Sequence, residues 1–251
     1  MTGPIERLRS APRKNRAGGW RAMVIGLALV LLAGWWVTRS SIFAARSITV
    51  EGNRHLTRAQ VLELAGVDAH TNLVWFLPGT VADRLRRSPW VREADVDRVL
   101  PSTLTISVRE RTAVAVVSGD RRLLVSDDRT VLGVAPADLD LPEIEADVGA
   151  ARIGGLLPEP NPGLQVVVAM PETLRIRLDR VFTNEQDVLM VRLDGDVLAI
   201  YGDASQARAK AQAVAALLRY AARHQIEAHR LDVRAPGHPA LLPGRGDRVE
   251  L

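Results

Sequence analysis

The feature that most constrains this chain is the run AMVIGLALVLLAGWWVT at residues 22–38, which contains no charged side chain. At about 1.5 Å per helical residue the run spans roughly 25 Å, which is short but adequate for a transmembrane helix. Trp20 precedes it and Trp35 and Trp36 lie near its end, where the two interfaces of a bilayer favour aromatic side chains. A cleaved signal peptide is the alternative, but the run exceeds the usual apolar region of about 7–15 residues and no clean cleavage site follows. We therefore expect a single transmembrane helix at residues 22–38, with the lipid bilayer as its partner.

The charge distribution predicts how this helix is oriented. Residues 1–21 contain six basic residues and one acidic residue, whereas the rest of the chain contains 27 basic and 28 acidic residues. Because positively charged flanks resist translocation, we expect residues 1–21 to be a cytoplasmic tail and residues 39–251 to lie outside. The net charge of +4 therefore comes from the tail. The remainder has no excess of positive charge with which to bind nucleic acid.

The chain lacks the patterns of common catalytic and metal sites. The absence of cysteine excludes disulfides, thiolate metal sites and thiol nucleophiles. The five histidines show neither an H-E-x-x-H motif nor paired metal spacing, and no G-x-S-x-G motif occurs. The segment containing Lys210 lacks the glycine spacing of a Walker A loop. Asp127 and Asp128 fit a turn better than an acid/base pair. We expect no enzymatic activity, no cofactor, no metal and no small-molecule substrate.

Residues 44–111 contain the signals of a small module with the order β-α-α-β-β. The segment SITVEG predicts a strand that closes at a Gly-Asn turn. Thr57 and Gln60 form a capping box before a helix that ends at Gly66. A second helix over residues 80–87 cannot continue past Pro89. Two strands follow, and the alternation in the second predicts a sheet covered by helices on one face only.

Residues 112–251 read as a β-rich region with one long helix. We expect a hairpin at 121–134 with its turn at 126–129, and strands at 173–178 and 188–202, the latter folded at Asp194-Gly195. A helix over 203–224 has Ser205 as its expected N-cap, and a strand at 229–236 precedes the apolar segment HPALLPG. Residues 140–163, rich in Gly, Pro and Ala, have no assignment.

The motifs ITVEGN, PWV and P-x-x-L-x-I-x-V-x-E-R resemble those of a POTRA (polypeptide-transport-associated) module. Directly behind a single anchor, such a module resembles the bacterial cell-division family FtsQ/DivIB. The strand ending in Tyr-Gly, the helix with a lysine in its first turns and the motif L-D-V-R resemble the second domain of that family. The resemblance implies an α+β fold with a cytoplasmic tail at 1–21, a transmembrane helix at 22–38, a POTRA domain at 44–111, a β-rich domain at 112–243 and a C-terminal tail at 244–251.

The resemblance also implies a function. The family members are non-enzymatic scaffolds of the division machinery, single-pass proteins of the bacterial plasma membrane with a cytoplasmic N-terminus, enriched at the septum. The POTRA module helps recruitment to the septum, and the β-rich domain pairs with small coiled-coil division proteins of the FtsB and FtsL type through its C-terminal edge. The corresponding partner-binding residues are Arg234, His238, Pro239, Ala240, Leu241 and Leu242.

Three alternatives remain open. Leu241 and Leu242 could close the core instead of binding a partner, although Pro239 favours an edge because proline cannot donate to a strand ladder. A POTRA-bearing secretion or assembly factor would need many more strands than the 140 residues behind the module supply. A membrane-anchored envelope enzyme, such as a wall hydrolase, would need an acid or a histidine lining a groove.

Overall fold

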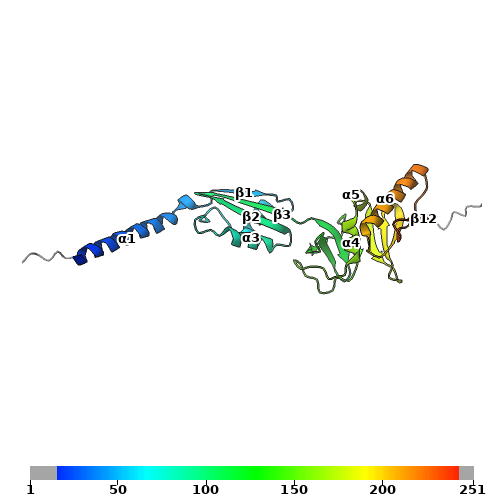
Figure 1. The fold of residues 1–251 in the computed structure, drawn as a ribbon, viewed down its shortest axis with the longest axis horizontal. Coiled ribbons are helices and arrows are strands. Elements are labelled where there is room, and N and C mark those ends of the chain that lie inside the picture. The colour runs from blue at the N-terminus through cyan, green and yellow to red at the C-terminus, as the bar shows by residue number, and fades with distance from the viewer. Residues whose placement is uncertain (1–15, 243–251) are drawn as a thin grey trace, which may run out of the picture.

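The computed structural model of the protein describes residues 16–242, so most of the expected cytoplasmic tail and the whole tail at 244–251 lie outside it. The first element, α1 (Arg16–Thr38), is a continuous helix that contains the uncharged run and extends away from the remaining elements (Figure 1). Within the described residues, no helix combines the length and the apolar character that crossing a membrane requires. The transmembrane helix expected at residues 22–38 therefore stays a prediction.

The next elements form the module expected to be a POTRA domain, with the predicted order β-α-α-β-β. Its sheet has the strand order β1-β3-β2, in which β1 is parallel to β3 and β2 is antiparallel to it. The elements are a 3-10 turn at Ser41–Phe43, β1 (Ser47–Glu51), α2 (Arg58–Ala65), α3 (Pro78–Arg86), β2 (Val91–Val99) and β3 (Thr103–Glu110).

Local sequence signals set the boundaries of these elements. The predicted capping box is present: the Thr57 hydroxyl accepts from the Gln60 backbone N–H, and the Gln60 side chain accepts from the Thr57 N–H at 2.8 Å. Gly66 ends α2 in the left-handed conformation, with φ of 65°. The inward-facing residues Ile106 of β3 and Leu85 of α3 belong to one buried cluster, as the alternation predicted. The helices therefore cover one face of this sheet.

The β-rich domain is built on one nine-stranded sheet with the order β12-β11-β10-β9-β8-β7-β4-β5-β6. Neighbouring strands are antiparallel except in the pairs β4–β7, β7–β8 and β10–β11. The strands are β4 (Ala113–Ser118), β5 (Arg122–Ser126), β6 (Val131–Val134), β7 (Glu143–Glu145), β8 (Leu178–Thr183), β9 (Leu189–Leu193), β10 (Val197–Gly202), β11 (Arg230–Asp232) and β12 (Ala240–Leu242). The helices are α4 (Pro162–Ala169), α5 (Glu172–Arg175) and α6 (Ala207–His224), and a 3-10 turn lies at Asp194–Asp196.

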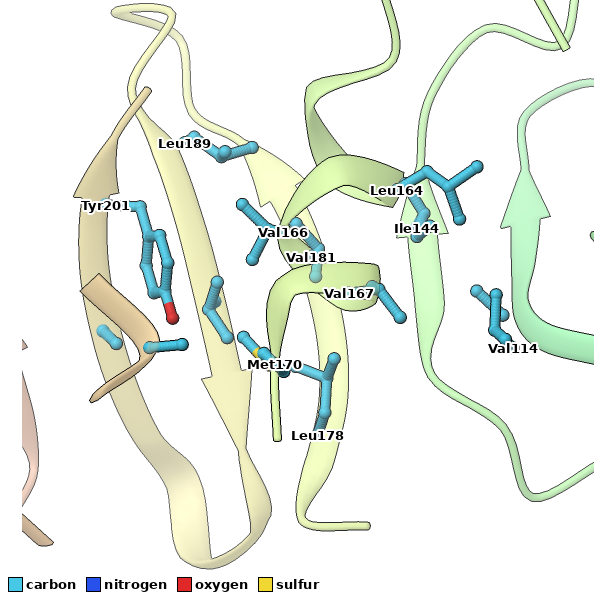
Figure 2. Packing of buried hydrophobic residues seen from close by; sticks show 14 of the residues in the cluster. Val114, Ile144, Leu164, Val166, Val167, Met170, Leu178, Val181, Leu189 and Tyr201 are labelled. Carbon is cyan, nitrogen blue, oxygen red and sulfur yellow. The ribbon is translucent and has the colours of Figure 1, made fainter. Parts of the chain in front are cut away.

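Helices α4 and α6 pack on this sheet and form the larger core of the molecule. Figure 2 shows side chains of α4 lying over the strands β7 and β8. A Cβ atom on Gly163 would come within 2.5 Å of the Ile144 side chain, so glycine lets the start of α4 approach β7 closely. A smaller buried cluster lies at the β4–β5–β6 end of the sheet and consists of Val116, Leu124, Leu132 and Ala135. The partly buried Trp90 of the POTRA domain packs against it.

Both predicted hairpins of this domain are present, but two expectations are wrong. Residues 173–178 are not a strand, because Pro171 serves as the N-cap of the short helix α5 and β8 begins only at Leu178. Ser205 is not the N-cap of α6, which begins at Ala207 after Gln206 in a left-handed conformation. The Ser205 hydroxyl instead donates to the Asp203 carboxylate. The unassigned residues 140–163 supply β7, in the middle of the sheet, and the start of α4.

Candidate functional site

The C-terminal segment forms the edge strand that we expected to be the binding site. β12 is the outermost strand at one end of the nine-stranded sheet. Within residues 16–242 it pairs only with β11, with the registers Arg230↔Leu242 and Asp232↔Ala240. The opposite end of the same sheet is β6. A free strand margin presents unpaired N–H and C=O groups that another strand can bind.

The hydrogen bonds of β11 show which groups of β12 face outward. The Leu198 N–H donates to the His229 carbonyl and the Val233 N–H donates to the Ile200 carbonyl, so the odd-numbered residues of β11 face β10. The main-chain groups of Arg230 and Asp232 therefore face β12, where they oppose Leu242 and Ala240. Because main-chain groups alternate in direction along a strand, those of the intervening residue, Leu241, point to the open margin.

The side chains of β12 bear on whether this strand closes the core or binds a partner. Leu241 is half-buried and packs against the main core, whereas Ala240 is exposed. The side chain of Leu241 thus belongs to the core while its main chain remains available at the margin. Pro239 precedes the strand and has no N–H. Continuing the alternation by two residues makes it the next outward position, which can accept a hydrogen bond but not donate one.

Arg234 lies just after the end of β11, and Asp232 holds its side chain. Its Nη2 is 2.6 Å from Oδ2 of Asp232, and its Nε donates to Oδ1 of the same carboxylate at 3.1 Å. The hydrogen bond from Arg234 lowers the pKa of Asp232, against a smaller opposing effect of burial. The arginine stem passes over Gly202, where an added Cβ would meet its Cγ at 3.1 Å. Arg234 is thus exposed but oriented.

The turn between β11 and β12 holds the remaining candidate, His238. Its N–H donates to the Ala235 carbonyl at 2.9 Å, which closes the turn before the edge strand begins. The structure therefore brings all six predicted residues together along one end of the sheet: Arg234, His238, Pro239, Ala240, Leu241 and Leu242.

A buried lysine supports this end of the sheet, and the sequence reasoning missed its role. Lys210 of α6 is 2% exposed, and its ammonium donates to the Tyr201 carbonyl at 2.9 Å and to the Asp203 carboxylate at 2.7 Å. These bonds tie the first turns of α6 to the end of β10. The Lys210 hydrogen bond is the main cause that lowers the pKa of Asp203 to about 2. The available signal was a lysine three residues after Ala207 and one before Ala211, inside the apolar stripe of the helix.

The aspartates of the β5–β6 turn form salt bridges with arginines of the POTRA domain. Arg111 Nε is 2.8 Å from Oδ2 of Asp128, and Arg92 pairs with Asp127. Burial raises the pKa of Asp128, but hydrogen bonds from Ser126, Arg111 and Thr130 outweigh that effect and lower it overall. These carboxylates therefore join the two domains. Across the described residues 16–242, no cluster of three or more histidine, aspartate or glutamate side chains could hold a metal ion.

Comparison with known proteins gives a consistent result. The model of the POTRA domain, FtsQ-type, matches residues 43–111. The cell division protein FtsQ of Streptomyces collinus is 30% identical, over 95% of this chain and 92% of that protein. FtsQ of Mycolicibacterium smegmatis is 30% identical over 87% of this chain, which spans 65% of that relative. The cell division protein DivIB of Geobacillus kaustophilus is 35% identical over 79 residues, which are 32% of this chain.

Proposed function

Because this chain belongs to the FtsQ/DivIB family of cell division proteins, we propose that it is a non-enzymatic scaffold of the bacterial division machinery that binds small coiled-coil proteins of the FtsB and FtsL type at the septum. The observation that carries the proposal is the free margin of β12, where the main chain of Leu241 points outward. A partner segment would add there as a tenth strand, with main-chain hydrogen bonds supplying much of the affinity.

Arg234 would set the register of that added strand. Within the described residues its hydrogen bonds go to Asp232 through Nε and Nη2, so Nη1 remains able to bind a carboxylate on the partner. Arginine suits this role because its planar fork holds the Asp232 carboxylate through Nε and Nη2 and still presents Nη1 to a partner, which a lysine cannot reproduce. The pairing with Asp232 holds the guanidinium in place before the partner arrives, which reduces the ordering cost of binding.

The scaffold would be tethered by α1, with residues 1–21 in the cytoplasm and residues 39–251 outside. The support is the uncharged run within α1, its exposed apolar side chains and the basic tail that precedes it. A reporter that is active only outside the cytoplasm, fused after Leu251, should be active. A purified mature chain that begins near residue 40 would contradict the anchor.

The binding edge is tested with a pair of variants at one position. Leu241→Ala removes the side chain but keeps the outward N–H, whereas Leu241→Pro also removes that N–H. We expect Leu241→Pro to capture an FtsB-type partner about fivefold less well than Leu241→Ala, since a lost main-chain hydrogen bond is worth about 1 kcal/mol and 1.4 kcal/mol corresponds to tenfold. Equal capture by the two variants would remove main-chain pairing at Leu241 from the proposal.

Two coarser changes test the site as a whole. Truncation after Pro236 should abolish partner capture while the POTRA domain stays folded and the protein stays in the membrane. Arg234→Glu should weaken capture by about 1 kcal/mol or more, the scale of a desolvated interfacial pair. If the truncated protein captures its partners with unchanged affinity, the interface lies elsewhere.

A further inference from the structure

The loop between α2 and α3 exposes large apolar side chains. In the segment LVWFL at residues 73–77, Leu73 and Phe76 are buried in the POTRA core. Trp75 and Leu77 point the other way and are 59% and 68% exposed. Exposing a tryptophan next to a leucine to water is unfavourable in free energy unless another surface covers them.

Hydrogen bonds from Arg98 fix the conformation of this loop, so Trp75 and Leu77 stay exposed in the folded domain. Arg98 of β2 donates from Nη1 to the carbonyls of Leu73 and Phe76, at 2.7 Å each. The same Nη1 lies 3.2 Å from the Val74 carbonyl. Turning Trp75 inward would break these charge-assisted bonds and displace Phe76 from the core.

The loop lies directly against the end of α1. The Asn72 side chain donates to the Thr38 carbonyl at 2.8 Å, and the Leu73 N–H donates to the Phe43 carbonyl at 2.8 Å. Thr38 is the last residue of α1, so the loop continues the apolar surface of that helix onto the POTRA domain. In Figure 1 the POTRA domain meets α1 at the end where β1 begins.

Further apolar side chains gather at the same end of the domain. The turn between β2 and β3 is tied to the start of β1 by a hydrogen bond from the Ser47 N–H to the Ser102 carbonyl at 3.1 Å. Val99 at the end of β2 and Leu100 in that turn are exposed, and the 3-10 turn after α1 exposes Ile42. We call the five exposed residues the apolar end patch: Ile42, Trp75, Leu77, Val99 and Leu100.

We propose that the apolar end patch lies in the interfacial layer of the lipid bilayer, beside the point where α1 leaves it, and fixes the tilt of the POTRA domain relative to the membrane. The inference rests on the proposed anchoring by α1. Lipid fits this surface because it is continuous with α1, and because tryptophan favours the headgroup level of a bilayer. Arg39 and Arg46 are exposed at the same end and would attract anionic headgroups.

The absence of native cysteine allows a direct test in the full-length chain. Trp75→Cys is labelled with an environment-sensitive fluorophore and reconstituted in phosphatidylcholine/phosphatidylglycerol vesicles that contain nitroxide lipids. Val30→Cys in α1 and Ile176→Cys, an exposed site in the β-rich domain, are labelled in the same way. We expect the nitroxide lipids to quench the labels at 30 and 75, and to leave the label at 176 unquenched.

The outcomes separate the two proposals. Quenching at 30 with none at 75 would overturn the membrane contact of the patch and leave the anchor standing. No quenching at 30 would overturn the anchor and, with it, this inference. An apolar emission spectrum at 75 that nitroxide lipids do not quench, and that is lost when the protein is diluted in lipid, would assign the patch to a second copy of the chain, which also overturns the inference.

A charge-substituted variant checks the same contact from another position. With the label at Val99→Cys, the double change Trp75→Asp and Leu77→Asp should abolish quenching, because two negative charges would replace the apolar contact and be repelled by the anionic headgroups. Both side chains are exposed, so the fold should tolerate the change. Ile176→Asp is the matched control and should leave quenching at 99 unchanged. Quenching that survives the double change would contradict the proposal.

Discussion

The two sheets of this protein differ in how their strands are specified. In the POTRA domain, β2 and β3 span Val91–Val99 and Thr103–Glu110 and alternate between buried and exposed side chains. In the β-rich domain, β7, β11 and β12 have three residues each. The long strands carry their own signal in the sequence, whereas the short strands depend on their neighbours in the sheet. Sequence patterns therefore predict the first sheet well and the second sheet only in part.

Strand β7 shows how neighbours stabilise a short central strand. It lies parallel to β4 on one side and to β8 on the other, and its only apolar residue, Ile144, is buried under α4. The two glutamates that flank Ile144 pair with arginines of β5 and β8: Glu143 with Arg122 and Arg180, and Glu145 with Arg180. One face of β7 therefore contributes to the core and the other to a ladder of charges.

The largest expected effect tests whether residues 44–111 fold as a separate unit. Ile106→Ala should lower the free energy of unfolding of the POTRA domain by about 2–5 kcal/mol, because it leaves a cavity in a fully buried position. Ser107→Ala, on the opposite face, should cost less than about 0.5 kcal/mol. Fluorescence of Trp90 and denaturant titration measure both. Equal effects would mean that the register is wrong, and a simultaneous loss of the β-rich domain would contradict separate folding.

Two glycines with positive φ, one in each domain, differ in how much space surrounds them. Gly52 has a φ of 81°, and an added Cβ would lie 2.0 Å from the Val108 carbonyl oxygen, whereas Gly195 has a φ of 69° and open space around it. Gly52→Ala should cost roughly 2–4 kcal/mol, since backbone strain and a clash combine. Gly195→Ala should cost about 1 kcal/mol from backbone strain alone. Thermal unfolding of the two variants measures the difference between their free energies of unfolding. That difference should vanish if the turn after β1 can move away from Val108.

Removal of the buried lysine should weaken the β-rich domain alone. Lys210→Met keeps the length of the side chain but leaves the Tyr201 carbonyl without its donor. The expected cost is about 1–3 kcal/mol, the usual penalty for a buried group that loses its partner. Arg208→Met, on the same helix but without any such buried contact, is the control. Hydrogen exchange of β10 and α6 should rise in the first variant, and unchanged exchange there would show that Lys210 does not hold this end of the sheet.

The smallest expected effect is a pH dependence confined to the β-rich domain. The pKa of Asp203 is lowered to about 2 from its usual value of 3.8, so its pairing with Lys210 stabilises the folded state above about pH 4. That contribution should be lost as the pH falls from about 4 towards 2. Asp203→Asn should remove this part of the pH dependence of the unfolding free energy. An identical acid profile in the variant would contradict the pairing.

The errors of sequence-based prediction have physical causes at particular residues. Residues 173–178 alternate like a strand, but Pro171 directs the chain into α5 before β8 begins. Serine is a common N-cap residue, but the Ser205 hydroxyl donates to the Asp203 carboxylate. The same carboxylate accepts from Lys210, which fixes the start of α6. The edge position of β12 was predictable from Pro239. The outward direction of the Leu241 main chain was not, because it depends on the pairing of β11 with β10.

Partner binding at one edge of the nine-stranded sheet and not at the other is tested most directly by crosslinking in cells. A photo-crosslinking residue is placed at Ala240 on β12 and, separately, at Val134 on β6, which is also exposed at the edge of the same sheet. Mass spectrometry then identifies what each position captures. Binding at the β12 edge predicts that an FtsB- or FtsL-type protein is captured from position 240 and not from position 134. Capture from position 134 alone, or equal capture from both, would contradict it.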